Sequence, residues 1–164
     1  MLHHGEQLPQ SVKVSTVTVR PPYDVARIAV LRKDGSIAFD AYNAFASSPA
    51  HMLRGAVEDA LSPYVGAAYP GNSAARADWT LETTVTALAL DCRQEGKCEA
   101  FVALTLAMLD SRRVLSVGKG EGREIATGGD FSAAFARAFA EAFDAAFGRL
   151  RAGMKSDTDD ARKQ

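Results

Sequence analysis

The fold is decided by residues 26–61, ARIAVLRKDGSIAFDAYNAFASSPAHMLRGAVEDAL. This stretch reads in order as a β-hairpin, an aromatic loop and a helix. The pair Asp34-Gly35 tolerates the positive φ angles of a two-residue turn, so it predicts strands at 27–33 and 36–42. The predicted register opposes Val30 to Phe39, Ile28 to Ala41 and Arg32 to Ile37 on one mostly apolar surface.

The helix at the end of this stretch has a marked start and a marked end. Ser48 is a good N-cap, and Pro49 suits the first helical position, where no backbone donor is needed. Pro63 predicts an end near Leu61 or Ser62. Apolar residues at helical spacing predict the buried face, which consists of Met52, Leu53, Ala56, Val57, Ala60 and Leu61.

Strands are expected on both sides of this stretch. The alternating, β-branched run at 11–19 predicts a first strand, and 64–69 predicts a short edge strand. A meander of three longer strands is expected at 78–92, 98–110 and 113–126. Its predicted register opposes Leu90 to Ala100, Leu88 to Val102, Thr84 to Leu106, Leu106 to Val117 and Phe101 to Gly122.

A second helix is expected from about Asp130, a good N-cap, to Arg151. Its phenylalanines recur every four residues, at positions 131, 135, 139, 143 and 147. Such a stripe is typical of a helix packed on a core, and the alternative is that the rings line a lipid pocket.

Together these elements predict a single α+β domain at 11–151. We expect an antiparallel-rich sheet of about six strands, with two helices packed mainly on one face. Residues 1–10 are expected to be flexible or an engineered remnant, and 152–164 to be a disordered tail. Both faces of the meander are largely apolar, so the face without helices is available for a partner.

The composition excludes several classes of function. The chain has 164 residues and a net charge of −1, with no basic patch, so nucleic acid is not an expected partner. Its apolar runs are shorter than the ~18 residues that a membrane span needs. The opening MLHHGEQLPQ lacks the positive leader and apolar segment of a signal peptide.

The two cysteines, Cys92 and Cys98, are separated by RQEGK at a predicted hairpin tip. Residues directly opposed in an antiparallel pair are close enough for a disulfide bond. Two free thiols are the main alternative. A metal site would need further ligands, and the three histidines do not supply them at a suitable spacing.

No stretch of the sequence carries a catalytic, cofactor or metal motif. The run Gly118-Lys-Gly-Glu-Gly-Arg123 lacks the Gly-Lys-Ser/Thr ending of a phosphate loop, so its glycines are expected to clear one face of a strand. Three aromatic residues in or beside loops, Tyr23, Tyr42 and Phe45, are the candidates for binding a partner, with half-buried packing as the alternative.

The order of these elements resembles the auxiliary lipoproteins of ABC-type, MCE-linked lipid transporters, the PqiC-like group. The resemblance spans roughly 12–150 and rests on the early strand, the hairpin ending in Tyr42-Asn43-Ala44-Phe45, the Ser48-Pro49 helix start, the meander and the terminal helix.

This resemblance implies a non-enzymatic, periplasmic accessory subunit of a lipid transport system. It implies an MCE-domain protein as partner and tethering to the outer membrane through an N-terminal lipid, on a cysteine upstream of residue 1. A homo-oligomer is also possible, and no cofactor is implied. The alternatives are a lipid-binding carrier module and an accessory lipoprotein of secretion or outer-membrane assembly.

Overall fold

The computed structural model describes residues 7–126 and 131–162, with side chains described as far as Lys155. It is an α+β structure of seven strands and two α-helices. The strands are β1 (Leu8–Val19), β2 (Arg27–Leu31), β3 (Ile37–Ala44), β4 (Val65–Tyr69), β5 (Trp79–Asp91), β6 (Glu99–Leu109) and β7 (Val114–Ile125). The helices are α1 (Pro49–Leu61), the short 3-10 turn η1 (Ser62–Tyr64) and α2 (Phe131–Arg162).

The seven strands form one mixed sheet centred on β5. Strand β6 pairs antiparallel with one edge of β5, and β7 pairs antiparallel with β6. The other edge of β5 is shared, because β1 runs parallel to its first part and β2 runs parallel to its last three residues. Strand β4 lies parallel to β1, and β3 lies antiparallel to β2. The expected antiparallel-rich sheet of about six strands is therefore corrected to a partly parallel sheet of seven.

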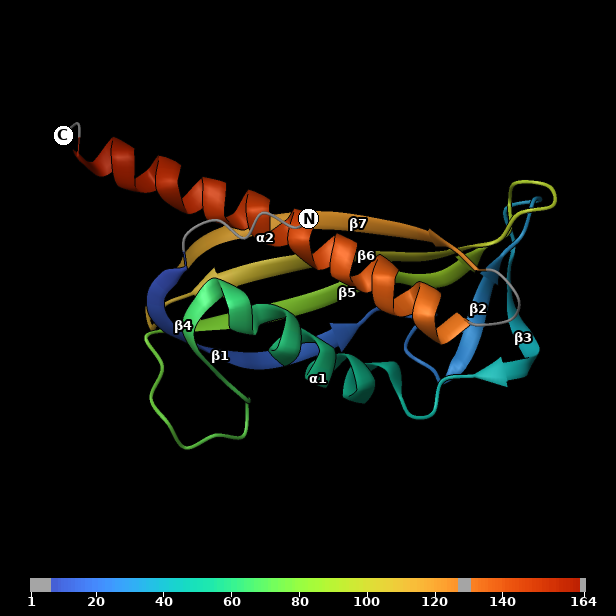
Figure 1. Ribbon diagram of the computed structural model, residues 1–164, viewed down its shortest axis with the longest axis horizontal. Helices are drawn as coiled ribbons and strands as arrows, with labels where there is room; N and C mark the ends of the chain where they lie inside the picture. The colour runs from blue at the N-terminus through green and yellow to red at the C-terminus, as the bar shows by residue number, and fades with distance from the viewer. Residues whose placement is uncertain (1–6, 127–130, 163–164) are drawn as a thin grey trace.

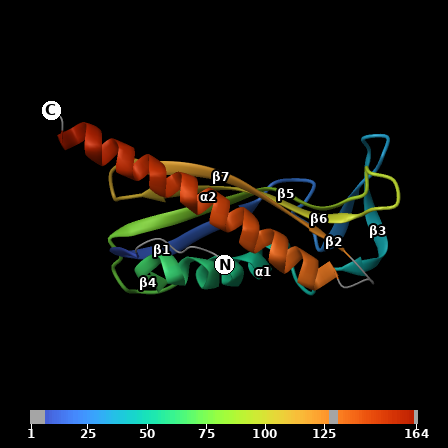
Figure 2. The ribbon, with the colours of Figure 1, turned by 45° about the horizontal axis from the view of Figure 1, so that its top comes forward.

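Both helices lie on the same face of this sheet (Figure 1), as the sequence predicted. Helix α1 connects β3 to β4 and packs on β1, while α2 crosses β6 and β7 diagonally (Figure 2). Strands β3 and β4, which α1 connects, run in opposite directions, because β3 is antiparallel to β2 and β4 is parallel to β1, while β1 and β2 are both parallel to β5. We call the opposite side of the sheet, which neither α1 nor α2 covers, the open face.

The bounds of several elements differ from the expectation. Strand β1 begins at Leu8, so residues 8–10 are strand rather than a flexible start. Helix α2 continues to Arg162, well beyond the predicted end at Arg151 and into the expected tail at 152–164. The predicted N-cap Asp130 lies outside the described residues. Helix α1 begins after Ser48 as predicted, although the Ser48 side chain makes no capping hydrogen bond.

The register predicted for the hairpin is wrong by one residue. The loop has three residues rather than two, because Arg32 N donates to Ser36 O at 2.9 Å and Gly35 N donates to Arg32 O at 2.9 Å. Gly35 takes the positive φ of 84° that ends such a loop. The observed partners are Ala29 and Phe39, Val30 and Ala38, and Leu31 and Ile37. A shift of one residue moves Phe39 and Ile37 to the face opposite Val30.

The register of the meander is confirmed near the β5–β6 loop and wrong farther away. Leu90 pairs with Ala100 and Leu88 with Val102, as predicted. A bulge between Val85 and Ala87 then shifts the pairing, so Thr84 lies opposite Thr105. In the next pair, Leu106 lies opposite Gly118 and Val102 opposite Gly122, which corrects two further predicted pairs.

The core lies between the sheet and the helices. The rings of Phe143 and Phe147 are fully buried and stack with their centroids 6.0 Å apart. The Tyr64 ring lies 4.5 Å from that of Phe147, and the Tyr64 hydroxyl donates to the Asp144 carboxylate on α2. Burial, helped by this hydrogen bond, raises the pKa of Tyr64 above its ordinary value. The aromatic stripe is therefore part of the core, as its helical spacing predicted.

Candidate functional site: the hairpin end

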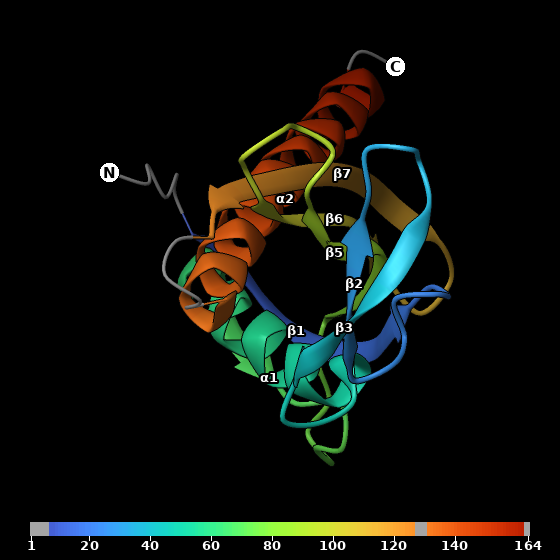
Figure 3. The same ribbon diagram turned by 90° about the vertical axis from the view of Figure 1, so that its right-hand side faces the viewer.

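Two connections between strands lie side by side at one end of the molecule, which we call the hairpin end: residues 32–36, between β2 and β3, and the β5–β6 loop (residues 92–98) (Figure 3). Cys92 N donates to Leu31 O at 2.9 Å, and the Lys33 ammonium lies 3.8 Å from the Glu95 carboxylate. Loops that are distant in the sequence are thus joined because β2 pairs with the last residues of β5.

A disulfide bond closes the β5–β6 loop. The sulfur atoms of Cys92 and Cys98 are 2.10 Å apart, and their Cα atoms are 4.3 Å apart. The disulfide predicted from the sequence is confirmed, and the alternatives of free thiols or a metal are not needed. Among the described residues, no three His, Cys, Asp or Glu side chains are grouped so as to hold a metal ion.

An ion-pair cluster around Asp91 lies beside this disulfide. Arg93 donates to both Asp91 carboxylate oxygens, through Nε at 2.8 Å and Nη2 at 2.7 Å. Arg123 Nη1 donates to Asp91 Oδ2 at 2.8 Å. These bonds, from Arg93 first and then Arg123, hold the pKa of Asp91 well below its usual range. Asp91 is therefore ionised at neutral pH and is a poor proton acceptor.

The remaining charges of the cluster also contact one another. Lys97 lies 2.8 Å from Glu99 and lowers the pKa of that carboxyl group. The Arg123 guanidinium lies 4.0 Å above the centre of the Phe101 ring, its cross-strand partner in β6. Such a contact is a cation–π interaction. These contacts stabilise the loop. The charged groups of the cluster pair with one another and are not arranged around a substrate.

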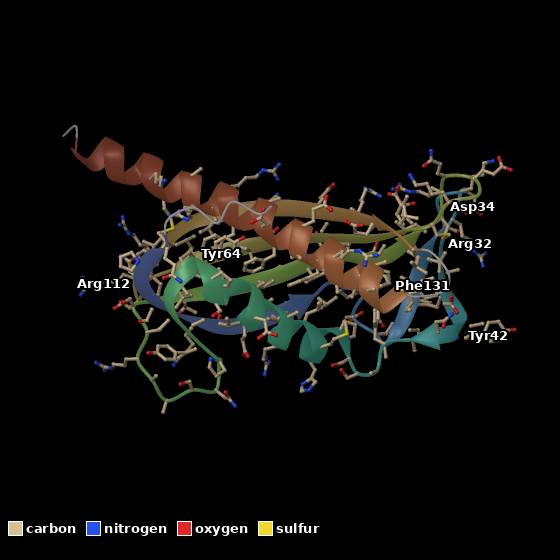
Figure 4. The ribbon with its side chains drawn as sticks, viewed as in Figure 1. Arg32, Asp34, Tyr42, Tyr64, Arg112 and Phe131 are labelled. Carbon is tan, nitrogen blue, oxygen red and sulfur yellow. A yellow bond between two sulfur atoms is a disulfide. The ribbon has the colours of Figure 1, made fainter. Side chains whose placement is uncertain are left out.

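The three aromatic candidates from the sequence lie in different surroundings. Tyr42 is 96% exposed and projects from the end that also carries Arg32 and Asp34 (Figure 4). Phe45 packs edge-on against Phe135 of α2, with ring centroids 5.4 Å apart, so it fastens the hairpin to the helix. Tyr23 is half-buried against the core. The structure thus leaves only Tyr42 of the three fully available to a partner.

Sequence reasoning missed the exposed apolar residues of the open face. A cross-strand row runs from Phe39 through Ala29, Ala89 and Phe101 to Arg123. Because Phe101 alternates with the buried, helix-facing Val102, this whole row belongs to the open face. Five large exposed side chains lie on it: Ile37 (41% exposed), Phe39 (38%), Val117 (52%) and Ile125 (51%) by the same alternation, and Val114 (54%) by its pairing with Leu109 across a bulge. The correct hairpin register would have revealed Ile37 and Phe39.

Neither helix in the described part of the chain combines the length and the apolar character that crossing a bilayer requires. The fold matches known crystal structures. Protein XCC0632 from Xanthomonas campestris superposes with a TM-score of 0.69 at 20% sequence identity, covering 94% of this chain and 90% of its own. A second, uncharacterised protein superposes with a TM-score of 0.62 at 12% identity, covering 96% of this chain and 94% of its own. These likenesses concern the fold.

Among curated proteins, no sequence matches this chain. The sequence model of the ABC-type transport auxiliary lipoprotein component matches residues 3–150, which include every strand, α1 and most of α2. A match of this length covers the whole sheet, α1 and α2 as far as residue 150, including the hairpin end and the open face. The chain belongs to the family of ABC-type transport auxiliary lipoprotein components.

Proposed function

We propose that this protein is a non-enzymatic, periplasmic accessory subunit of an ABC/MCE-type lipid transport system, tethered to the outer membrane through an N-terminal lipid. Its partner is the MCE-domain protein of that system, and it acts through protein contacts. Family membership supports the role of auxiliary transport component. The MCE partner and the outer-membrane tether follow from the resemblance of the chain to the PqiC-like group.

The observation that carries the proposal is the exposed apolar surface beside Tyr42. Ile37 and Phe39 lie on β3 at the edge of the open face, and Tyr42 follows them on the same strand. Aromatic and aliphatic side chains that are exposed together supply the contact area at the centre of protein interfaces. The charged cluster of the hairpin end, in contrast, is internally paired and supports no reaction.

Photocrosslinking tests the proposal directly. Tyr42 is replaced by p-benzoylphenylalanine in the full chain expressed in its own cell envelope, and crosslinked products are identified by mass spectrometry. We expect an MCE-domain protein to be captured from Tyr42. The same group at Arg54, which is exposed on α1, is the matched control and should capture far less of that protein.

Two further outcomes decide the proposal. Phe39→Ser should reduce the crosslink from Tyr42 while leaving the melting temperature nearly unchanged, since Phe39 is partly exposed. Equal capture from Tyr42 and Arg54, or products without any MCE-domain protein, would contradict the proposal. Sedimentation of the lipidated protein with inner rather than outer membranes would contradict the tether alone.

A further inference from the structure

A hollow of about 590 Å³ lies along β5, β6 and β7, at a distance from the hairpin end, and extends to the edge of β7, where Ala145 and Arg149 of α2 line it. Its floor and rim include three threonines, two basic residues and one acidic residue: Thr84, Thr86, Thr105, Arg20, Lys119 and Glu121. Arg149 of α2 completes the rim by reaching over the edge of β7, where it donates to the Lys119 carbonyl oxygen.

The sheet register explains why a hollow forms at this place. Thr18, Thr84, Thr105 and Lys119 are successive cross-strand neighbours on β1, β5, β6 and β7. The adjacent row contains only the small residues Ala87 and Ala103 before it reaches Glu121. Short side chains in the middle of the sheet and long ones at its edge leave a depression with a floor of hydroxyl groups.

The charges around this hollow differ from those around Asp91. In the part of the chain that the structure describes, neither the Arg20 guanidinium nor the Lys119 ammonium makes a hydrogen bond or ion pair with another side chain. The hydroxyl groups of Thr84, Thr86 and Thr105 make no hydrogen bond with the described residues either. The rim carries three positive charges, on Arg20, Lys119 and Arg149, and one negative charge, on Glu121. Its net charge is therefore positive. Hydroxyl donors beside basic side chains are the groups that bind phosphate oxygens.

We propose that this hollow binds the phosphate group of a phosphate ester. The Lys119 ammonium and the Arg20 guanidinium pair with the phosphate oxygens, and the hydroxyl groups of Thr84 and Thr105 donate to them. Glu121 at the same rim opposes the anion and weakens its binding. This site is separate from the partner surface at Tyr42, so it does not depend on the function proposed above.

Nuclear magnetic resonance titration of the full chain tests this site. The probes are inorganic phosphate and glycerol 3-phosphate, each compared with sodium chloride at the same ionic strength. We expect saturable shifts of the Thr84, Thr105 and Lys119 backbone amides with the phosphate probes only. A parallel sedimentation assay uses vesicles of phosphatidylglycerol and distinguishes a lipid headgroup from a soluble ester.

Four variants make the test specific. The double variant Arg20→Gln/Lys119→Met should weaken binding about tenfold or more, because it removes two charged donors. Thr105→Val should weaken binding with no change of charge, and Glu121→Gln should strengthen it. Lys33→Met, which removes a lysine from the hairpin end, is the matched control and should bind like the parent chain.

Each outcome has a defined meaning. Soluble probes that bind and lose affinity in the double variant support a site for free phosphate esters. Vesicle binding alone, lost in the same variant, supports the phosphate of a lipid headgroup. The proposal is overturned if neither probe nor vesicle binds, if the double variant binds as well as the parent chain, or if Lys33→Met loses as much affinity as the double variant.

Discussion

Three glycines of β7 determine how closely α2 approaches the sheet. A Cβ atom on Gly118, Gly120 or Gly122 would lie closer than 3.0 Å to backbone atoms of α2. The facing helix positions, Ala138, Ala142 and Ala146, are fully buried. Small residues on both elements therefore bring the helix backbone directly onto the strand, and this contact has no room for an added methyl group.

Replacing Gly120 by alanine tests this close contact. The added Cβ would meet the Ala142 carbonyl oxygen and the Ala146 backbone nitrogen, so α2 must move away from the sheet. We expect Gly120→Ala to lower the free energy of unfolding by about 1–3 kcal/mol in a urea titration. Gly148→Ala is the control, because nothing lies within 4 Å of that position and alanine favours the helix. A Gly120→Ala protein as stable as the parent chain would refute this packing.

The Tyr64 hydroxyl joins η1 to α2 through the Asp144 carboxylate. The raised pKa of Tyr64 means that the folded state favours the protonated phenol. Its contribution to stability is fully present below the unfolded pKa of about 10 and is lost as the pH rises above that value.

Tyr64→Phe should therefore lower the free energy of unfolding by about 1–2 kcal/mol at pH 7, because the variant has no hydroxyl group to donate to Asp144. The difference between the parent chain and Tyr64→Phe should shrink as the pH rises above about 10, because Tyr64 then loses its proton in the unfolded chain and ionisation favours unfolding. Denaturant titrations at several pH values measure this difference. A difference that stays constant through alkaline pH would show that folding does not raise the pKa of Tyr64.

At the scale of elements, the β5–β6 hairpin tip is stabilised by a disulfide and by charge. The disulfide fixes the loop ends, and Asp91 joins Arg93 of the loop to Arg123 of β7. Because the pKa of Asp91 is lowered in the folded state, its contribution is present above the unfolded pKa of about 3.9. That contribution is lost as the pH falls below this value.

Asp91→Asn should lower the free energy of unfolding by roughly 1–3 kcal/mol at pH 7, since the variant loses charge-assisted bonds to two arginines. The variant should also lose less stability than the parent chain between about pH 5 and pH 2, because no carboxylate remains at this position to be protonated. Asp59→Asn, at an exposed position of α1, is the control and should leave both quantities nearly unchanged. Identical acid profiles for Asp91→Asn and the parent chain would contradict this account.

At the scale of the whole molecule, an aromatic layer fills the space between α2 and the sheet. Phe139, Phe143 and Phe147 follow one another along α2 with ring centroids about 6 Å apart, and Tyr64 packs against the last two. Rings that contact one another in this way form a packed core. This arrangement favours a protein that binds partners at its surface over one that carries lipid inside.

Native mass spectrometry of the purified protein checks this interpretation. We expect the mass of the chain alone, with no stoichiometric lipid adduct, because the rings occupy the place where an acyl chain would lie. The measurement should be repeated after incubation with phospholipid vesicles. A single lipid retained at one per chain, and lost in Phe143→Ala, would instead support the carrier alternative.

Local patterns predicted most elements but few of their long-range pairings. The helix start at Ser48-Pro49, the short edge strand and the three meander strands were found within a few residues, because each depends on local periodicity and on turn or cap residues. The parallel pairing of β1 and β2 with β5 was missed, since no local signal reports which distant strand a segment meets. Of the candidate site, the exposure of Phe39 was hidden by a one-residue error in the hairpin loop.

The sequence by itself determined the α+β class, the disulfide between Cys92 and Cys98, the buried aromatic stripe and the family, because spacing and element order are properties of the chain alone. Only the tertiary structure decided the close contact of α2 with the β7 glycines, the ion pairs of Asp91 and the composition of the open face. Each of these depends on bulges and loop lengths that shift the register by one residue. In a pleated sheet, such a shift decides which side chains face the helices and which face a partner.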